Sequence, residues 1–175
     1  MDKYTKLLQS FSQFSAQSVP QHWADLGCGS GVFTEALANM LPSQSSIIGI
    51  DKTLYTLNEK MGNQINVIFK KADFVSDDLP ITTLDGILMA NTLHFVKDKG
   101  NLITKLEKYF ASTPRFIIVE YEQSIANRWV PNPIAFLELK RLFIKLGYNN
   151  ITKMAELKSA YGGMMYACFC EKTPF

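Results

Sequence analysis

Three glycines stand at every second position in segment 25–31, of sequence DLGCGSG, and an acid lies two residues before the first of them. Glycine has no Cβ, so its backbone can take positive φ and let a ligand approach closely. A short apolar segment precedes the loop and a helical pattern follows it, an arrangement that presents backbone N–H groups to a nucleotide-like ligand. Dinucleotide-binding loops carry a further glycine at the sixth position of G-x-G-x-x-G, where this chain has Val32.

Two acids stand where later strands are expected to end. Asp51 closes the apolar segment 46–51 and lies 24 positions after Gly27. A carboxylate there can accept hydrogen bonds from both hydroxyls of a ribose, or it can cap a following helix. Asp73 follows the apolar segment 65–70, and the residues alone show only a polar strand end or a solvated loop aspartate.

Polar and aromatic side chains follow the next two expected strands. His94 lies just after segment 84–90, and its imidazole could remove a proton from a hydroxyl or ammonium group. It could instead pack and form hydrogen bonds at the strand end. Tyr121 and Trp129 could stack on a substrate and Arg128 could bind a carboxylate, or the three could belong to a surface loop fixed by an aromatic ring. Tyr161, in a terminal turn, has less support.

The elements that must position these residues alternate between strand and helix patterns. In an open parallel sheet, ligands bind beyond the carboxyl ends of the strands, and each residue above falls at such an end. The last two strands are joined through Tyr161-Gly162-Gly163, a connection so short that they must pair antiparallel. We expect strands at 22–26, 46–51, 65–70, 84–90, 115–121, 151–157 and 164–170, and helices at 32–41, 54–61, 102–110 and 132–146. An N-terminal helix is expected from the apolar stripe Tyr4, Leu7, Leu8, Phe11 and Phe14.

Length and composition set the bounds on function. The 175 residues suffice for one α/β domain with a sizeable core. A net charge of +2 gives no electrostatic argument for a nucleic-acid partner, and no apolar stretch reaches the length of a membrane span. The N-terminus lacks the apolar region of a secretory signal, and three cysteines do not suit a disulfide framework. We therefore expect a cytoplasmic protein, and no set of residues predicts a metal site.

The pattern Asp-x-Gly-x-Gly-x-Gly resembles the first motif of the class I S-adenosylmethionine-dependent methyltransferases. The resemblance implies a Rossmann-like three-layer α/β/α sandwich with a seven-stranded, mostly parallel sheet in the order 3-2-1-4-5-7-6, the last strand antiparallel. It implies one methyltransferase domain over residues 1–175, with the N-terminal helix within 1–19 packed on or covering the cofactor site. The implied cofactor is S-adenosyl-L-methionine, which leaves as S-adenosyl-L-homocysteine. Its expected binding residues are Asp25, Gly27, Cys28, Gly29, Gly31, Asp51, Lys52, Asp73, Phe74 and Asn91.

Within that family, the acid at Asp73 commonly meets the adenine amino group, with Phe74 against the ring, and Asn91 lines the methionine end. The expected reaction is methyl transfer to an oxygen or nitrogen of a small molecule, with His94 as the catalytic base and Tyr121, Arg128 and Trp129 as substrate-binding residues. The Asp/Asn-Pro-Pro-Tyr/Phe signature of amino-directed nucleic-acid methylases is absent after residue 90. Two alternatives stay open: a nicotinamide-dependent oxidoreductase, and a cofactor-binding module of this fold without turnover. The acceptor and the oligomeric state stay open as well.

Overall fold

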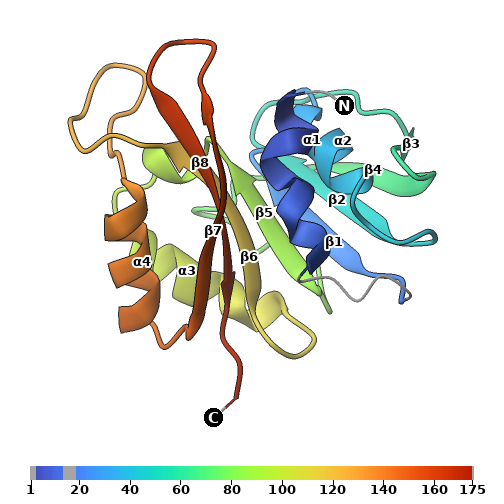
Figure 1. Ribbon diagram of the computed structural model, residues 1–175. Helices are drawn as coiled ribbons and strands as arrows, with labels where there is room; N and C mark the ends of the chain where they lie inside the picture. Colours follow the sequence, from blue (N-terminus) through green and yellow to red (C-terminus); the bar gives the residue numbers. More distant parts are fainter. Residues whose placement is uncertain (1–2, 14–18, 175) are drawn as a thin grey trace.

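The computed structural model describes residues 3–13 and 19–174, and one mixed sheet runs through the centre of the molecule (Figure 1). The sheet has eight strands in the order β3-β4-β2-β1-β5-β6-β8-β7. Their bounds are β1 His22–Leu26, β2 Ser46–Asp51, β3 Lys60–Met61, β4 Ile65–Lys71, β5 Gly86–Ala90, β6 Arg115–Tyr121, β7 Asn150–Lys158 and β8 Met164–Glu171.

The strand directions confirm the predicted topology. Strands β4, β2, β1, β5 and β6 are parallel neighbours, and β8 pairs antiparallel with both β6 and β7. The predicted order 3-2-1-4-5-7-6 is therefore correct for the seven long strands. The two-residue strand β3, antiparallel to β4 at the edge, is an eighth strand that the sequence did not predict.

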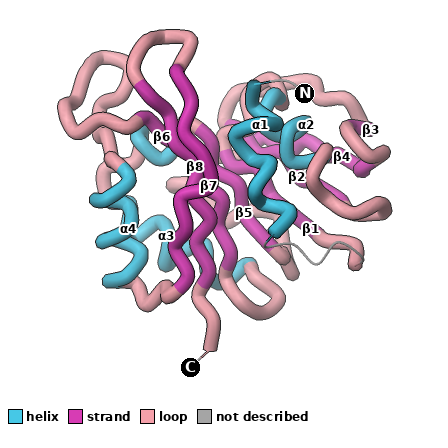
Figure 2. Tube along the Cα trace, viewed as in Figure 1, coloured by secondary structure: helices cyan, strands magenta, loops and turns pink. Residues whose placement is uncertain are grey.

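Helices cover both faces of the sheet, which makes the three layers expected (Figure 2). Helix α1 (Lys3–Leu8), the 3-10 helix Gln9–Gln13 and α2 (Val32–Ala38) lie on one face. Helices α3 (Lys99–Leu106) and α4 (Phe136–Lys145) lie on the other, and 3-10 turns are formed by Leu93–Phe95 and Glu107–Tyr109. The core is thus split into two apolar clusters by strands such as β5 and β6, whose central residues are buried on both faces, as parallel strands between helices require.

The N-terminal apolar stripe packs as core. Leu7, Leu8 and Phe11 are buried with residues of α2, and the Phe11 ring meets Trp23 edge to face. Phe14, which belongs to the predicted stripe, lies outside the described residues. A further role of this segment over the cofactor site stays a prediction.

The helix predicted over 54–61 is wrong. Residues 52–59 form an irregular segment, and Met61 pairs with Ile65 in the edge strand β3. Leu54 is 72% exposed, so only Leu57 and Met61 of the supposed apolar stripe reach the core. Thr53, Tyr55, Thr56 and Asn58 have modest helix propensity, and one buried and one half-buried position do not compensate for it.

The helix predicted over 132–146 begins later, at Phe136. Asn132 does not cap it: the Asn132 backbone N–H and side-chain amide both donate to the His94 carbonyl, at 3.0 and 3.3 Å. The Glu138 side chain accepts from the Ala135 N–H at 3.2 Å and caps the helix instead. Asn132 before Pro133 is a typical helix start, but here the donors of Asn132 bind the His94 carbonyl in the 3-10 turn Leu93–Phe95 instead.

Candidate active site

The glycine loop joins the ends of β1 and β2. The N–H groups of Gly27 and Cys28 both donate to the Ile50 carbonyl, at 2.7 and 3.1 Å. All three glycines have positive φ, namely 77° at Gly27, 51° at Gly29 and 86° at Gly31, which precedes α2. Side chains with a Cβ rarely adopt this region, so the backbone path itself requires glycine here.

Open space beside Gly29 distinguishes it from the first glycine of the loop. A Cβ built on Gly29 meets nothing within 4 Å, whereas one on Gly27 would overlap the methyl group of Thr92. The Thr92 hydroxyl donates to the Leu26 carbonyl at 3.1 Å and holds this packing in place. Gly27 is therefore needed for packing against the loop after β5, and Gly29 leaves room for a ligand.

Asp51 lies beside that open space. Its Oδ2 accepts from the Gly29 N–H at 3.0 Å, and its Oδ1 accepts from the Thr53 N–H at 2.8 Å. Residues 52–59, directly after Asp51 in the described chain, form no helix, so the helix-cap alternative does not apply. Lys52, next in the chain, is exposed. The carboxylate is half-buried and retains lone pairs for further donors, because each of its oxygens can accept more than one hydrogen bond.

Asp25 lies beneath the loop rather than at its surface. It is only 1% exposed, and its Oδ2 accepts from the Thr34 hydroxyl at 2.6 Å. Burial raises the pKa of Asp25 to about 7, the Thr34 hydrogen bond opposes that rise, and the nearby Asp51 charge adds to it. Its Oδ1 is buried and has no hydrogen-bond partner among the described residues.

Asn91 presents a second such oxygen at the end of β5. Its backbone, at φ 55°, leaves the strand while its N–H still donates to the Val119 carbonyl of β6 at 2.8 Å. Its side-chain Oδ1 is also buried without a partner in the part of the chain that is described. Buried acceptors are rarely left unsatisfied, so the oxygens of Asn91 and Asp25 call for donors from a ligand.

Two further residues of the predicted cofactor set have mainly local contacts. The Asp73 Oδ1 accepts from the Val75 N–H at 2.9 Å, and the Asp73 N–H donates to Asp77 at 2.8 Å, which closes a turn after β4. Phe74 is half-buried against the core.

Cys28, between the first two glycines of the loop, carries a thiol. Burial and the charges of Asp25 and Asp51 raise the pKa of Cys28 to about 12, so its thiol stays protonated.

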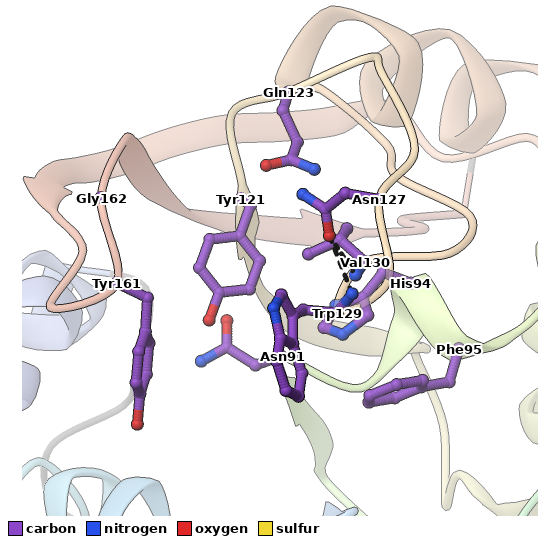
Figure 3. Close-up of a pocket in the computed structure, with 10 residues that line it drawn as sticks. All are labelled: Asn91, His94, Phe95, Tyr121, Gln123, Asn127, Trp129, Val130, Tyr161 and Gly162. Atoms are coloured by element: carbon purple, nitrogen blue, oxygen red, sulfur yellow. Dashed lines mark hydrogen bonds between the residues drawn. The ribbon is translucent and has the colours of Figure 1, made fainter.

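A cavity of about 570 Å³ opens beyond the ends of β5 and β6 (Figure 3). It is bounded by the loop that follows β6 and by the 159–163 turn, which lie at the same end of the molecule in Figure 1. The antiparallel register explains this meeting, because Tyr121 at the end of β6 pairs with Met165 at the start of β8. The lining residues are Asn91, His94, Phe95, Tyr121, Gln123, Asn127, Trp129, Val130, Tyr161 and Gly162.

His94 reaches the cavity wall with a carboxylate behind it. Its Nδ1 lies 2.7 Å from Glu120 Oε2, and its backbone N–H donates to Glu120 Oε1 at 3.0 Å. Both side chains are buried, at 3% and 1% exposure. Because an ionised carboxylate only accepts hydrogen bonds, Nδ1 is the donor toward an ionised Glu120, and in a neutral ring the lone pair is then on Nε2. This is the arrangement of an oriented base.

The three predicted substrate-binding residues take different positions. Tyr121 and Trp129 line the cavity, and burial raises the pKa of Tyr121, so its phenol stays protonated. Arg128 is not among the lining residues: its guanidinium lies 5.2 Å from the centre of the Trp129 ring, on which it stacks. Tyr161 lines the cavity from the opposite turn.

Sequence reasoning did not predict the pairing of Glu120 with His94, or five residues that line the cavity, namely Phe95, Gln123, Asn127, Val130 and Gly162. A carboxylate at the end of the otherwise apolar run Phe116-Ile117-Ile118-Val119 was a usable signal for Glu120, because buried charges require a partner. Nothing in the local sequence singled out the two amides. Among the described residues there is no group of three or more His, Cys, Asp or Glu side chains that could hold a metal ion, and no helix is long and apolar enough to cross a membrane.

The sheet order, the glycine loop and the acid that ends β2 together define a class I S-adenosylmethionine-dependent methyltransferase. The chain belongs to the methyltransferase-domain family, whose model matches residues 24–111.

Curated relatives and solved structures are consistent with this assignment. The chain is 33% identical over 92 residues to trans-aconitate 2-methyltransferase of Acidovorax sp. strain JS42, over 53% of this chain and 35% of that protein. The Pseudomonas aeruginosa enzyme of the same name is 32% identical over 89 residues, 50% of this chain and 31% of that protein. The match thus spans about a third of the length of these relatives.

Two solved structures share the fold. A SAM-dependent methyltransferase from Aquifex aeolicus has a TM-score of 0.68 at 15% identity, covering 98% of this chain and 90% of that one. The 1,6-didemethyltoxoflavin-N1-methyltransferase of Burkholderia thailandensis has a TM-score of 0.69 at 15% identity, covering 98% and 79%. At these identities the likeness concerns the fold.

Proposed function

We propose that this protein transfers a methyl group from S-adenosylmethionine to an oxygen or nitrogen atom of a small molecule bound in the cavity, and releases S-adenosylhomocysteine. The observation that carries the proposal is the His94–Glu120 pair, a buried and oriented imidazole at the wall of a cavity that Asn91 also lines. Asn91 follows β5, which pairs with β1 and therefore lies next to the glycine loop.

The residues at the loop fit this cofactor. The unobstructed face of Gly29 admits a ligand, and Asp51 beside it supplies the carboxylate that the two ribose hydroxyls need. The unpartnered oxygens of Asp25 and Asn91 are the acceptors that the ammonium group of the methionine end requires. Asp73 and Phe74 would meet the adenine from the neighbouring strand end β4, as the resemblance implies. Gly27, Gly31, Cys28 and Lys52 shape the loop and its exposed rim.

When bound, S-adenosylmethionine supplies a methyl group already activated by its sulfonium, so the protein has mainly to position the acceptor and take its proton. His94 Nε2 accepts that proton from a hydroxyl or N–H group. Glu120 fixes the tautomer through Nδ1–H and offsets the positive charge that the ring then carries. Tyr121 and Trp129 hold the acceptor against this base.

The curated relatives are named for trans-aconitate, a tricarboxylate. A carboxylate acceptor needs cationic partners, and none of the described residues that line the cavity is Lys or Arg. We therefore include trans-aconitate in the test as a competing acceptor.

The test begins with cofactor binding. Calorimetric titration of the full chain with S-adenosylhomocysteine and, separately, with NAD⁺ should give binding to the first only. S-adenosylmethionine labelled in its methyl group, incubated with the protein and a small-molecule cell extract, should then yield a labelled product that the His94→Ala variant does not form. If S-adenosylhomocysteine does not bind, the proposal is wrong. If it binds but no methyl group is transferred to any molecule of the extract, the protein is a cofactor-binding module without turnover.

A further inference from the structure

The cavity beyond β5 and β6 is walled by aromatic rings. Phe95, Tyr121, Trp129 and Tyr161 surround it from three separate segments of the chain (Figure 3). Trp129 and Tyr161 are 73% and 91% exposed; Arg128 lies over one face of the Trp129 ring, and the remaining ring surface is available to a ligand. Flat aromatic walls gain most from a flat aromatic ligand, which they contact by offset or edge-to-face stacking.

Charge further narrows the ligand class. None of the described lining residues is Asp, Glu, Lys or Arg, and Glu120 lies behind His94 and is already paired with it. An aromatic cavity can also attract a cation, but the Arg128 guanidinium already lies on the Trp129 ring and repels a second positive charge there. The cavity is therefore built for an uncharged molecule.

Two amides add a polar edge with a defined polarity. The Asn127 Oδ1 accepts from the N–H groups of Trp129 and Val130, both at 2.9 Å, which leaves its NH₂ group to donate to a ligand. The Gln123 Nε2 donates to the Ile125 carbonyl at 3.1 Å, which leaves its Oε1 to accept. These bonds fix which way each amide points, so the edge offers the Asn127 NH₂ group as donor and the Gln123 Oε1 as acceptor, beside the second N–H of Gln123.

We propose that the methyl acceptor is an uncharged, planar heteroaromatic molecule that carries a lactam-like N–H/C=O edge for Asn127 and Gln123 and a hydroxyl or ring N–H for His94. This proposal rests on the proposed function and specifies its substrate class. The reacting hydroxyl gives its proton to His94 Nε2, its oxygen forms the bond to the methyl carbon, and the sulfonium leaves as the neutral thioether.

The experiment compares ligands matched in shape. 6-Hydroxyquinolin-2-one has two fused rings, a hydroxyl and a lactam, whereas 2-naphthol has the rings and hydroxyl without the lactam. Each is titrated into the 175-residue chain saturated with S-adenosylhomocysteine, alongside trans-aconitate and ethanolamine as the anionic and amine competitors. We expect the quinolinone to bind about tenfold more tightly than 2-naphthol, and neither competitor to bind.

Variants separate the stacking from the polar edge. Trp129→Ala should weaken both aromatic ligands about tenfold. The matched control is Ile125→Ala, in the same loop and 84% exposed outside the cavity lining, and it should change neither affinity. Asn127→Asp keeps the oxygen that accepts from Trp129 and Val130 but replaces the donor, so it should reduce the preference for the quinolinone to within twofold.

The outcomes separate the two proposals. If S-adenosylhomocysteine does not bind, the proposed function fails. If it binds but trans-aconitate or ethanolamine binds more tightly than both aromatic ligands, the substrate class is wrong and the proposed function stands. An unchanged preference in Asn127→Asp likewise overturns the assignment of the polar edge, because that variant retains the loop contacts.

Discussion

Replacement of Glu120 by glutamine tests the proposed base most sharply. The two Glu120 oxygens face the His94 backbone N–H at 3.0 Å and the His94 ring Nδ1 at 2.7 Å. Glutamine presents one oxygen and one NH₂ group to these two positions. If its oxygen stays with the backbone N–H, its NH₂ must donate to Nδ1, and the ring proton must move to Nε2. The variant therefore keeps the shape of the site but removes the lone pair that would accept the substrate proton.

The magnitudes follow from these contacts. The weak Tyr121 N–H contact at 3.4 Å is lost, and the two hydrogen bonds between His94 and residue 120 lose the charge of the carboxylate, which together costs about 1–2 kcal/mol in the free energy of unfolding. For a chain of this size that lowers Tm by roughly 2–8 °C. Loss of a general base costs about 10²–10⁴ in kcat. Turnover should thus fall far more than stability.

The assay has two parts. ¹⁵N NMR of the imidazole nitrogens reports the tautomer directly, and the spectrum is simple because the chain has only two histidines, His22 and His94. Methyl-transfer rates and S-adenosylhomocysteine affinity are measured on the same samples. We expect the proton on Nδ1 in the natural chain and on Nε2 in Glu120→Gln, a kcat at least 100-fold lower, and unchanged affinity for S-adenosylhomocysteine.

Glu122→Gln is the matched control. Glu122 accepts from the Phe136 N–H and the Lys153 amine and has no bond to His94. That variant should keep the natural tautomer and rate. A Glu120→Gln protein with the switched tautomer and a normal rate would show that His94 is no base, and a lost rate with the natural tautomer would assign Glu120 a structural role.

Three predictions concern the cofactor loop. Gly29→Val should reduce S-adenosylhomocysteine affinity at least tenfold with a stability loss of about 1–2 kcal/mol from a β-branched residue at φ 51°; calorimetry and thermal unfolding measure the two, and unaltered affinity contradicts it. Asp51→Asn should cost about 1.5–3 kcal/mol of that affinity, and an effect within error removes Asp51 from the site. Because burial raises the pKa of Asp25 to about 7, the contribution of this residue to the free energy of unfolding is most favourable below about pH 4 and falls by about 4 kcal/mol as the pH rises to 7. Asp25→Asn should flatten this fall in denaturant titrations across that window, and an equal slope in both proteins refutes the assignment.

The strands could be predicted because their signal is local. Runs such as Phe116-Ile117-Ile118-Val119 are apolar at every position, and strands 46–51 and 115–121 have the bounds that the sequence predicts. The helix over 54–61 failed because a spacing of three and four residues says nothing about which side chains the fold will bury. Leu54 is exposed, and Met61 belongs to a strand edge that exists only next to β4.

The site was predictable in part for the same reason. The glycines lie within the single segment 25–31, and Asp51 ends the next apolar strand, 22 positions after Gly29; the structure joins Gly29 and Asp51 directly. Glu120 and His94 are 26 residues apart, and only the pairing of β5 with β6 brings the two strand ends together. The orientation of the Asn127 amide is set by the N–H groups of Trp129 and Val130, which lie in a loop without regular structure. A periodic pattern in the sequence cannot predict such a contact.

Asn91 links the two halves of the site. Its backbone N–H continues the β5–β6 pairing while its positive φ turns the chain toward the 3-10 turn of Leu93–Phe95, which carries His94. Asn91 lines the cavity and follows the strand next to β1, and its Oδ1 is buried and unpartnered among the described residues. In the proposed function, a cofactor that reaches the oxygens of Asn91 and Asp25 would lie between the glycine loop and His94. Because the sheet fixes the carboxyl ends of β1 and β5, the separation of such a cofactor from His94 would be set by the strands.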